Sequence, residues 1–210
     1  MHVPDGFLSP QVTIPAWAAA VPLWAWSARR HFGREAVEAL PVIGSLTALS
    51  FVVQTIAIPV PGGTSTHLLG ATLLALLYRP LVAFVCESLV LLVQALFFGA
   101  GGITALGVNA LAMGLLGPLA GWMAFRLLRP LGGRGAAFAA AYLSMQVASL
   151  AAAGALGLQH ALDPGYFPVP FAVTLAATML PSLTLAGFAE GAYTLFALSV
   201  MRRAGLHGLS

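Results

Sequence analysis

The sequence predicts an all-α, polytopic membrane protein, a bundle of seven transmembrane helices, and three observations support this prediction. Hydrophobic residues make up 60% of the 210 positions, and only 7% carry a charge. The mean hydropathy of +0.94 lies far above the range of soluble globular domains. Apolar stretches separated by short polar or Gly/Pro-rich breaks recur along the chain, and about 20 such residues cross a bilayer core about 30 Å thick.

The first three spans are recognised from apolar runs at residues 11–28, 38–58 and 67–78. The third is exceptional, because its 12 residues make a helix of only about 18 Å, too short to cross the bilayer core. The preceding segment, residues 59–67, contains a Pro-Gly-Gly sequence. We therefore expect it to dip inward as a re-entrant loop, which membranes tolerate only where protein or a cavity surrounds it.

The last four spans follow at residues 81–98, 103–125, 136–158 and 171–200. The sixth is rich in alanine, and small residues spaced four apart allow helices to approach closely. The seventh contains Pro181, which predicts a kink or break because proline removes a backbone donor. With no internal repeat or soluble region evident, residues 1–210 are predicted to form a single integral-membrane domain.

The basic residues predict the orientation of the chain in the membrane. All nine are arginines, in four groups that each follow an odd-numbered span: Arg29, Arg30 and Arg34; Arg79; Arg126, Arg129 and Arg134; Arg202 and Arg203. Because basic residues concentrate in cytoplasmic connections, the amino terminus is expected outside the cell and the carboxyl terminus in the cytoplasm. The lack of lysine excludes a Walker A loop, so active transport would need a separate ATPase.

The opening segment, residues 1–10 with the sequence MHVPDGFLSP, is predicted to bind a metal ion. It lacks the features of a signal peptide, so Met1 is expected to remain with a free amine. That amine, the peptide nitrogen of His2 and Nδ1 of its ring can close chelate rings around one ion, with a fourth nitrogen from His67. Planar nitrogen coordination favours Ni(II) or Cu(II) over zinc, magnesium or calcium. In the Pro-Asp-Gly turn, Asp5 is expected to bond to its own backbone.

Other interpretations of these residues remain open. A histidine near a terminus is ordinarily frayed, and one on a Gly-rich loop is often only a hydrogen-bonding group. An intramembrane hydrolase using Ser65 is one alternative, although GGTSTH lacks the G-x-S-x-G pattern. A stand-alone metal permease driven by an ion gradient is another. The roles of Glu87, Glu190 and His160 are also open, since a carboxyl within a span can line a metal path, contact a partner or hydrogen-bond to a neighbouring helix.

Three stretches, MHVPDGFLSP, VPGGTSTHLLG and GGITALGVNALAMGLLGP, resemble the signature stretches of the CbiM/NikM family. This family comprises the substrate-binding membrane components of cobalt and nickel energy-coupling-factor (ECF) transporters, a class of ABC transporter. The resemblance implies seven helices in a prokaryotic cell membrane, an N-terminal segment inserted into the core, and a metal site formed by Met1, His2 and His67. It implies transport of Ni(II) or Co(II) without catalysis or a catalytic cofactor, and does not decide between the two metals.

The resemblance also implies partners and supporting residues. The expected partners are a transmembrane coupling (T) component, two cytoplasmic ATPase subunits and often a small auxiliary membrane subunit, with no role for nucleic acid. Asp5, Ser65 and Asn109 are candidates for supporting the metal ligands. The chain departs from the family at Ala100 and Ala112, where Asp and Asn are common, and these departures concern the surroundings of Asn109.

Overall fold

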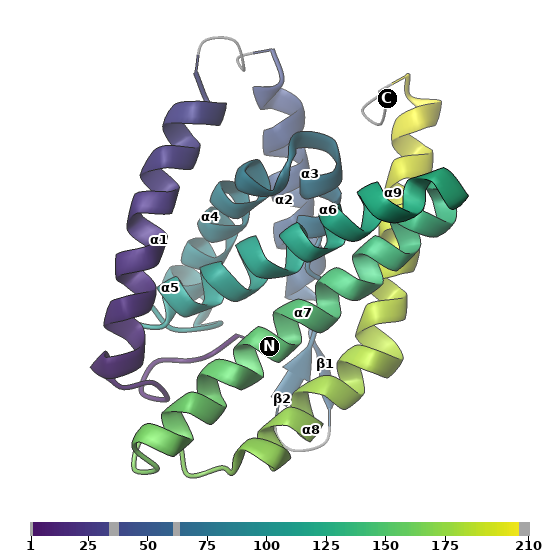
Figure 1. The fold of residues 1–210 in the computed structure, drawn as a ribbon. Coiled ribbons are helices and arrows are strands. Elements are labelled where there is room, and N and C mark those ends of the chain that lie inside the picture. Colours follow the sequence, from purple (N-terminus) through teal and green to yellow (C-terminus); the bar gives the residue numbers. More distant parts are fainter. Residues whose placement is uncertain (1, 34–37, 61–63, 206–210) are drawn as a thin grey trace.

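The computed structural model describes residues 2–33, 38–60 and 64–205, which form a bundle of helices with one short hairpin (Figure 1). The helices are α1 (Pro10–His31), α2 (Leu40–Thr55), α3 (Ala71–Tyr78), α4 (Pro80–Phe98), α5 (Leu106–Asn109), α6 (Gly117–Leu128), α7 (Gly133–Leu162), α8 (Phe171–Pro181) and α9 (Gly187–Arg203). The strands are β1 (Ile58–Val60) and β2 (Thr64–Thr66).

Two pairs of these helices form continuous segments. A π-helical stretch, Ala110–Leu116, joins α5 to α6, and another, Ser182–Ala186, joins α8 to α9. The described residues therefore make seven helical segments, which confirms the predicted fold class. The second π-helical stretch begins directly after Pro181, where the sequence predicts a kink or break, because proline disrupts the regular hydrogen-bond pattern.

Four segments of the described chain are long and apolar enough to cross a membrane: Pro80–Phe98, Leu106–Leu131, Gly133–Leu162 and Phe171–Arg203. Helix α2 is apolar but shorter, with 16 residues. Helix α3 has only eight residues, about 12 Å of helix, and cannot cross a bilayer alone. It begins at Ala71 rather than at the predicted His67, because Gly70 before it has a left-handed backbone (φ +71°) that does not belong to a helix.

The predicted re-entrant segment, residues 59–67, is more regular than expected. Strand β1 pairs antiparallel with β2, with Ile58 opposite Thr66, while the connection at residues 61–63 lies outside the described residues. Pairing satisfies the backbone groups that an irregular loop would leave without partners. His67 follows β2 directly, so the hairpin places it in the interior of the bundle, where its side chain is 3% exposed.

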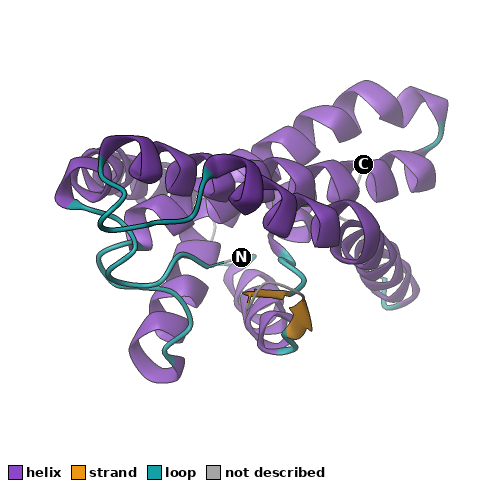
Figure 2. Ribbon diagram, turned by 90° about the horizontal axis from the view of Figure 1, so that it is seen from below, coloured by secondary structure: helices purple, strands orange, loops and turns teal. Residues whose placement is uncertain are grey.

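Helix α7 packs along α6, α8 and α9, and small residues let the helices approach closely (Figure 1). A Cβ added at Gly117 would lie 2.8 Å from the backbone oxygen of Ser144, and one at Gly121 would lie 2.7 Å from that of Ala140. The α6–α7 contact therefore depends on the absence of side chains at these two glycines. Seen from below, the amino-terminal end lies among the helices, close to the hairpin (Figure 2).

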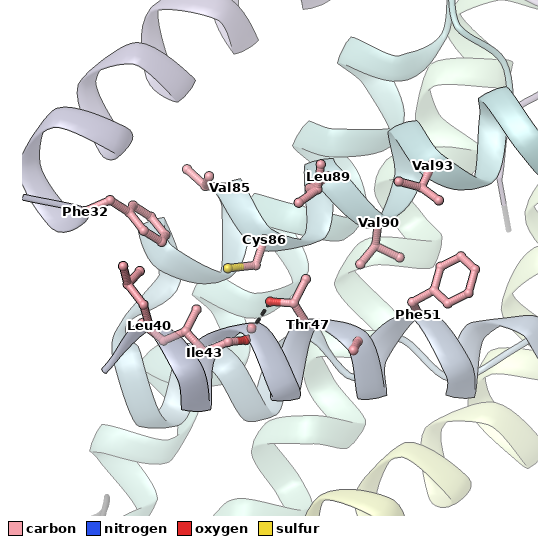
Figure 3. Close-up of a pocket in the computed structure, with 12 residues that line it drawn as sticks. Phe32, Leu40, Ile43, Thr47, Phe51, Val85, Cys86, Leu89, Val90 and Val93 are labelled. Carbon is pink, nitrogen blue, oxygen red and sulfur yellow. Dashed lines mark hydrogen bonds between the residues drawn. The ribbon is translucent and has the colours of Figure 1, made fainter. Parts of the chain in front are cut away.

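An apolar groove lies between α2 and α4 (Figure 3). Ile43 on α2 and Val85 and Leu89 on α4 are among the residues that line it. The lining also includes Thr47, whose hydroxyl donates to the carbonyl of Ile43 at 2.7 Å, and the thiol of Cys86. Because this lining offers a single soft ligand among apolar side chains, the groove is not a candidate metal site.

Candidate metal centre

The N-terminal segment lies inside the helical bundle, where Val3 is 1% exposed. Asn109, the last residue of α5, binds Val3 twice: its Oδ1 accepts from the Val3 N–H at 2.9 Å, and its Nδ2 donates to the Val3 carbonyl at 3.0 Å. The same carbonyl accepts from the N–H of Gly102 at 3.0 Å. The structure thus confirms the inserted segment, and Asn109 holds it despite the departures at Ala100 and Ala112.

Asp5 fixes the next turn of the segment, but not through its own backbone as the sequence predicted. Its carboxylate instead accepts from the N–H groups of Ile103 at 3.0 Å and Thr104 at 2.8 Å, and from the Thr104 hydroxyl. The Thr104 hydroxyl, followed by these backbone N–H groups, lowers the pKa of Asp5 below its ordinary value. Gly6 completes the turn with φ +87°. The acidic side chain therefore ties the N-terminal turn to the loop before α5.

A third attachment joins the end of the segment to α7. The N–H of Ser9 donates to Oε1 of Gln159 at 2.7 Å, and Leu8 packs in a buried cluster with Val3 and Val108. Residues 3–9 are consequently held at several points by α5, α7 and the loop between α4 and α5. His2 stands immediately before the first of these attachments, which restricts where its ring can lie.

His2 and His67 meet in the interior although they are far apart in the sequence. Their ring centroids are 4.5 Å apart, and the ring planes are inclined by 13°. In each ring Nε2 is buried and has no hydrogen-bond partner among the described residues. Nδ1 of His67 lies 2.9 Å from the carbonyl of Leu68, which places its proton on Nδ1 and leaves the lone pair on Nε2. Two neighbouring imidazoles with unpartnered nitrogens are a suitable environment for a cation.

The surroundings of the two rings have further unpartnered groups. Gln54 of α2 and Gln94 of α4 lie beside the ring of His2, and their buried side-chain oxygens have no other partner in the described part of the chain. No group of three or more His, Cys, Asp or Glu side chains able to hold a metal ion occurs among the residues described. A metal ion bound between the two histidines would therefore take its remaining ligands from other groups, such as main-chain nitrogens.

The structure describes only some of the other residues that the sequence singled out. Met1 and the side chain of Ser65 lie outside the described residues, so the structure does not test the predicted amine ligand or the hydroxyl. His160 lies in the last turn of α7, and its Nδ1 is 3.0 Å from the carbonyl of Phe167. That contact gives it a structural role at the end of α7, separate from the pair formed by His2 and His67.

The sequence did not assign roles to Glu87 and Glu190, and the structure places both in a network behind His67. Each side chain is 0% exposed. Glu190 accepts from backbone N–H groups just after His67, and Glu87 accepts from the amide of Gln54. A carboxyl within an apolar span needs polar partners, because an isolated charge is costly there, and this is the signal that the sequence offers. Which partners it finds depends on contacts between distant helices.

Gly102 offers a test of whether the N-terminal segment must stay in place. A Cβ at this position would overlap both the carboxylate and the backbone nitrogen of Asp5. We expect Gly102→Ala to displace the segment and to weaken Ni(II) binding by about tenfold or more. Gly154→Ala on α7 is the matched control, since a Cβ there meets nothing within 4 Å. Titration of both purified variants checks this, and wild-type affinity in Gly102→Ala would contradict it.

The chain matches a known protein family over almost its whole length. The profile of the CbiM family, described as a cobalt uptake substrate-specific transmembrane region, matches residues 2–207. The chain belongs to the CbiM family. Members of the CbiM family are named as transport proteins, so the chain is not an enzyme and the hydrolase alternative is wrong.

Individual CbiM relatives agree with this assignment. The fused nickel transport protein NikMN of Rhodobacter capsulatus is 38% identical over 206 residues, covering 90% of this chain and 58% of that protein. The cobalt transport protein CbiM of Geobacter sulfurreducens is 34% identical over 201 residues, covering 92% of this chain and 57% of that protein. This chain thus spans less than two thirds of either. A crystal structure of a truncated transition metal transporter has a TM-score of 0.92 at 34% identity, covering 97% of this chain and 99% of that one.

Proposed function

We propose that this chain captures Ni(II) or Co(II) from outside the cell, as the substrate-binding component of an ATP-driven uptake transporter. The observation that carries the proposal is the buried pair of imidazoles: the rings of His2 and His67 lie 4.5 Å apart, and Nε2 of His67 has no partner among the described residues. Membership of the CbiM family supports it, and so do relatives named for nickel and for cobalt. The metal ion is the cargo, held until the transporter releases it inward.

In the proposed site the ion binds four nitrogens in a plane. The amine of Met1, the peptide nitrogen of His2 and the imidazole of His2 supply three, and the imidazole of His67 supplies the fourth. The contacts of Asn109 and Asp5 support this arrangement, because these hydrogen bonds within the protein fix the segment that follows His2. Ligands positioned in advance lose less conformational entropy on binding, which favours tight capture.

The chain is proposed to work with a transmembrane coupling component, two cytoplasmic ATPase subunits and, in some systems, a small auxiliary membrane subunit. The sequence contains no lysine, and a Walker A loop requires a lysine, which supports the need for an external ATPase. Arg29 and Arg30 lie in the last turn of α1, and Arg202 and Arg203 lie in the last turn of α9, which supports a cytoplasmic position for these ends. Uptake by cells that lack any ATPase partner would instead favour a gradient-driven permease.

Metal titration of the purified, untagged protein tests the proposal directly. We expect one Ni(II) or one Co(II) per chain, and with Ni(II) the absorption spectrum of a planar low-spin complex. Mg(II) should not compete, because it prefers oxygen ligands and octahedral geometry. Failure to bind Ni(II) and Co(II), or binding of Mg(II) with equal affinity, would contradict the proposed site.

Metal affinity is expected to fall on acidification, because protons compete with the ion for the nitrogen lone pairs. Asp5 does not cause this loss: its pKa is lowered in the folded protein, so its contacts to Thr104 persist at any pH above its ordinary pKa and are lost only well into acid. Titrations between about pH 8 and about pH 5 should show a progressive loss, because an α-amine ordinarily protonates near pH 8 and the peptide nitrogen of His2 must release its proton to bind the ion. A constant Ni(II) affinity over that range would be incompatible with nitrogen ligands.

A further inference from the structure

The backbone that carries His67 is held by side chains from two other helices. Between β2 and α3, the N–H of Leu69 donates to Oε2 of Glu190 at 2.8 Å, and the N–H of Gly70 donates to Oε1 at 3.0 Å. On the opposite side of the same peptide unit, the carbonyl of Leu69 accepts from Nε2 of Gln54 at 2.8 Å. The segment just after the histidine is therefore held from α9 and from α2, in addition to its covalent connections.

The carboxylate of Glu190 is well suited to this role. It faces the start of α3, where backbone N–H groups lack partners within the helix and the helix dipole favours a negative charge. Glu190 is 0% exposed, and no ion pair to it is found among the described residues, so these two backbone groups are its main partners. Two hydrogen bonds from neighbouring backbone N–H groups to the two oxygens of one carboxyl fix direction as well as distance.

There is little freedom in the backbone at this point. Gly70 has φ +71°, and a Cβ there would lie 2.6 Å from Oγ of Ser50 on α2. The peptide must therefore lie against α2 while Glu190 binds it from α9. Any shift in the position of Leu69 would be carried to His67 two residues earlier, and so to its imidazole, which stacks against the ring of His2.

Glu87 provides a natural comparison with Glu190. Both carboxyls are completely buried and lie close enough to interact electrostatically. Glu87, however, contacts the segment only indirectly: its Oε1 accepts from the amide of Gln54, and its Oε2 has no partner among the described residues. The two glutamates thus share burial and chemistry, but only Glu190 binds the backbone next to His67.

We propose that Glu190 is a positioning residue for metal capture, whose carboxylate sets the backbone at residues 69–70 and so aims the imidazole of His67 at the ion. The inference rests on the proposed function, because it gives Glu190 a role through a metal ligand. It predicts that weakening this contact loosens one of the ligands and speeds dissociation of the ion, while the bundle itself remains assembled. It also means that a movement of α9 would be transmitted to the metal site through the side chain of Glu190.

Glu190→Gln and Glu87→Gln form a matched pair for the test. In Glu190→Gln one of the two acceptor oxygens becomes an NH₂ group that opposes a backbone N–H, so at least one of the two bonds is lost. In Glu87→Gln the side chain keeps an oxygen that can accept from Gln54. We expect Glu190→Gln to weaken Ni(II) binding by about tenfold or more and to raise the dissociation rate, with a shifted Ni(II) absorption band. Glu87→Gln should change affinity by less than about threefold.

The outcomes separate the inference from the proposed function. If the wild-type protein does not bind Ni(II), the proposed function fails. If the wild type binds but Glu190→Gln matches it in affinity and spectrum, Glu190 does not position His67. Equal losses in the two variants would also overturn the inference, because they would reflect the removal of any buried carboxyl.

A second variant covers the case in which Glu190→Gln does not fold. Glu190→Asp keeps the carboxyl group but shortens the side chain by one methylene, so the carboxyl cannot reach both N–H groups without a shift. We expect weaker Ni(II) binding with the metal-free thermal unfolding midpoint close to that of the wild type. Unchanged affinity and an unchanged absorption band in Glu190→Asp would overturn the inference.

Discussion

Replacing His67 with alanine is expected to weaken Ni(II) binding by more than about 100-fold. Loss of a group that merely supports a metal ligand costs about 10 to 100-fold, and removal of a ligand should cost more. The imidazole of His67 is 3% exposed, its Nδ1 is paired with the carbonyl of Leu68, and only its Nε2 is free to bind an ion. His2→Ala should act similarly, because its ring stacks against that of His67 with the centroids 4.5 Å apart. Calorimetric titration of the purified variants measures both effects.

His160→Ala is the control for these two variants. It removes the same kind of side chain from the end of α7, where the ring contacts the carbonyl of Phe167 rather than the paired imidazoles. We expect its Ni(II) affinity to remain within a few-fold of the wild type. If His160→Ala and His67→Ala lose the same affinity, the ion does not bind between His2 and His67.

Adding one glycine before Met1 is expected to abolish tight Ni(II) binding while leaving the fold intact. The proposed chelate uses the amine of Met1, and an added residue converts that amine into a peptide nitrogen and moves the free amine away. The attachments of Val3 and Asp5 lie after this point, so they hold the extended chain as before. A protein that begins at Met1 and one with the added glycine should differ by more than about 100-fold in affinity.

The thermal unfolding midpoint of the metal-free proteins provides the control for this extension. Equal midpoints would show that the loss concerns the ligand and not the bundle. Full-affinity binding by the extended protein would mean that the Met1 amine is not a ligand, and the ion would then depend on the side chains of His2 and His67 with other donors.

Most of the helical framework could be predicted from the sequence, because the length and hydropathy of a span are local properties. The start of α3 was placed too early for an equally local reason: an apolar run does not reveal that Gly70 adopts φ +71°. The hairpin of β1 and β2 was predicted as an irregular loop, since its two strands are only three residues each. Such short strands carry little hydrophobic periodicity.

By itself, the sequence determined the seven helical segments, the absence of a Walker A loop, and the ligand chemistry available from His2 and His67. Only the tertiary structure decided which polar groups meet. Val3 binds Asn109 across 106 positions, and Leu69 binds Glu190 across 121. The physical reason is that apolar span length depends on neighbouring residues, whereas the partner of a buried polar group depends on how distant helices pack. Each such group must find a partner within the bundle, and the sequence does not say where that partner lies.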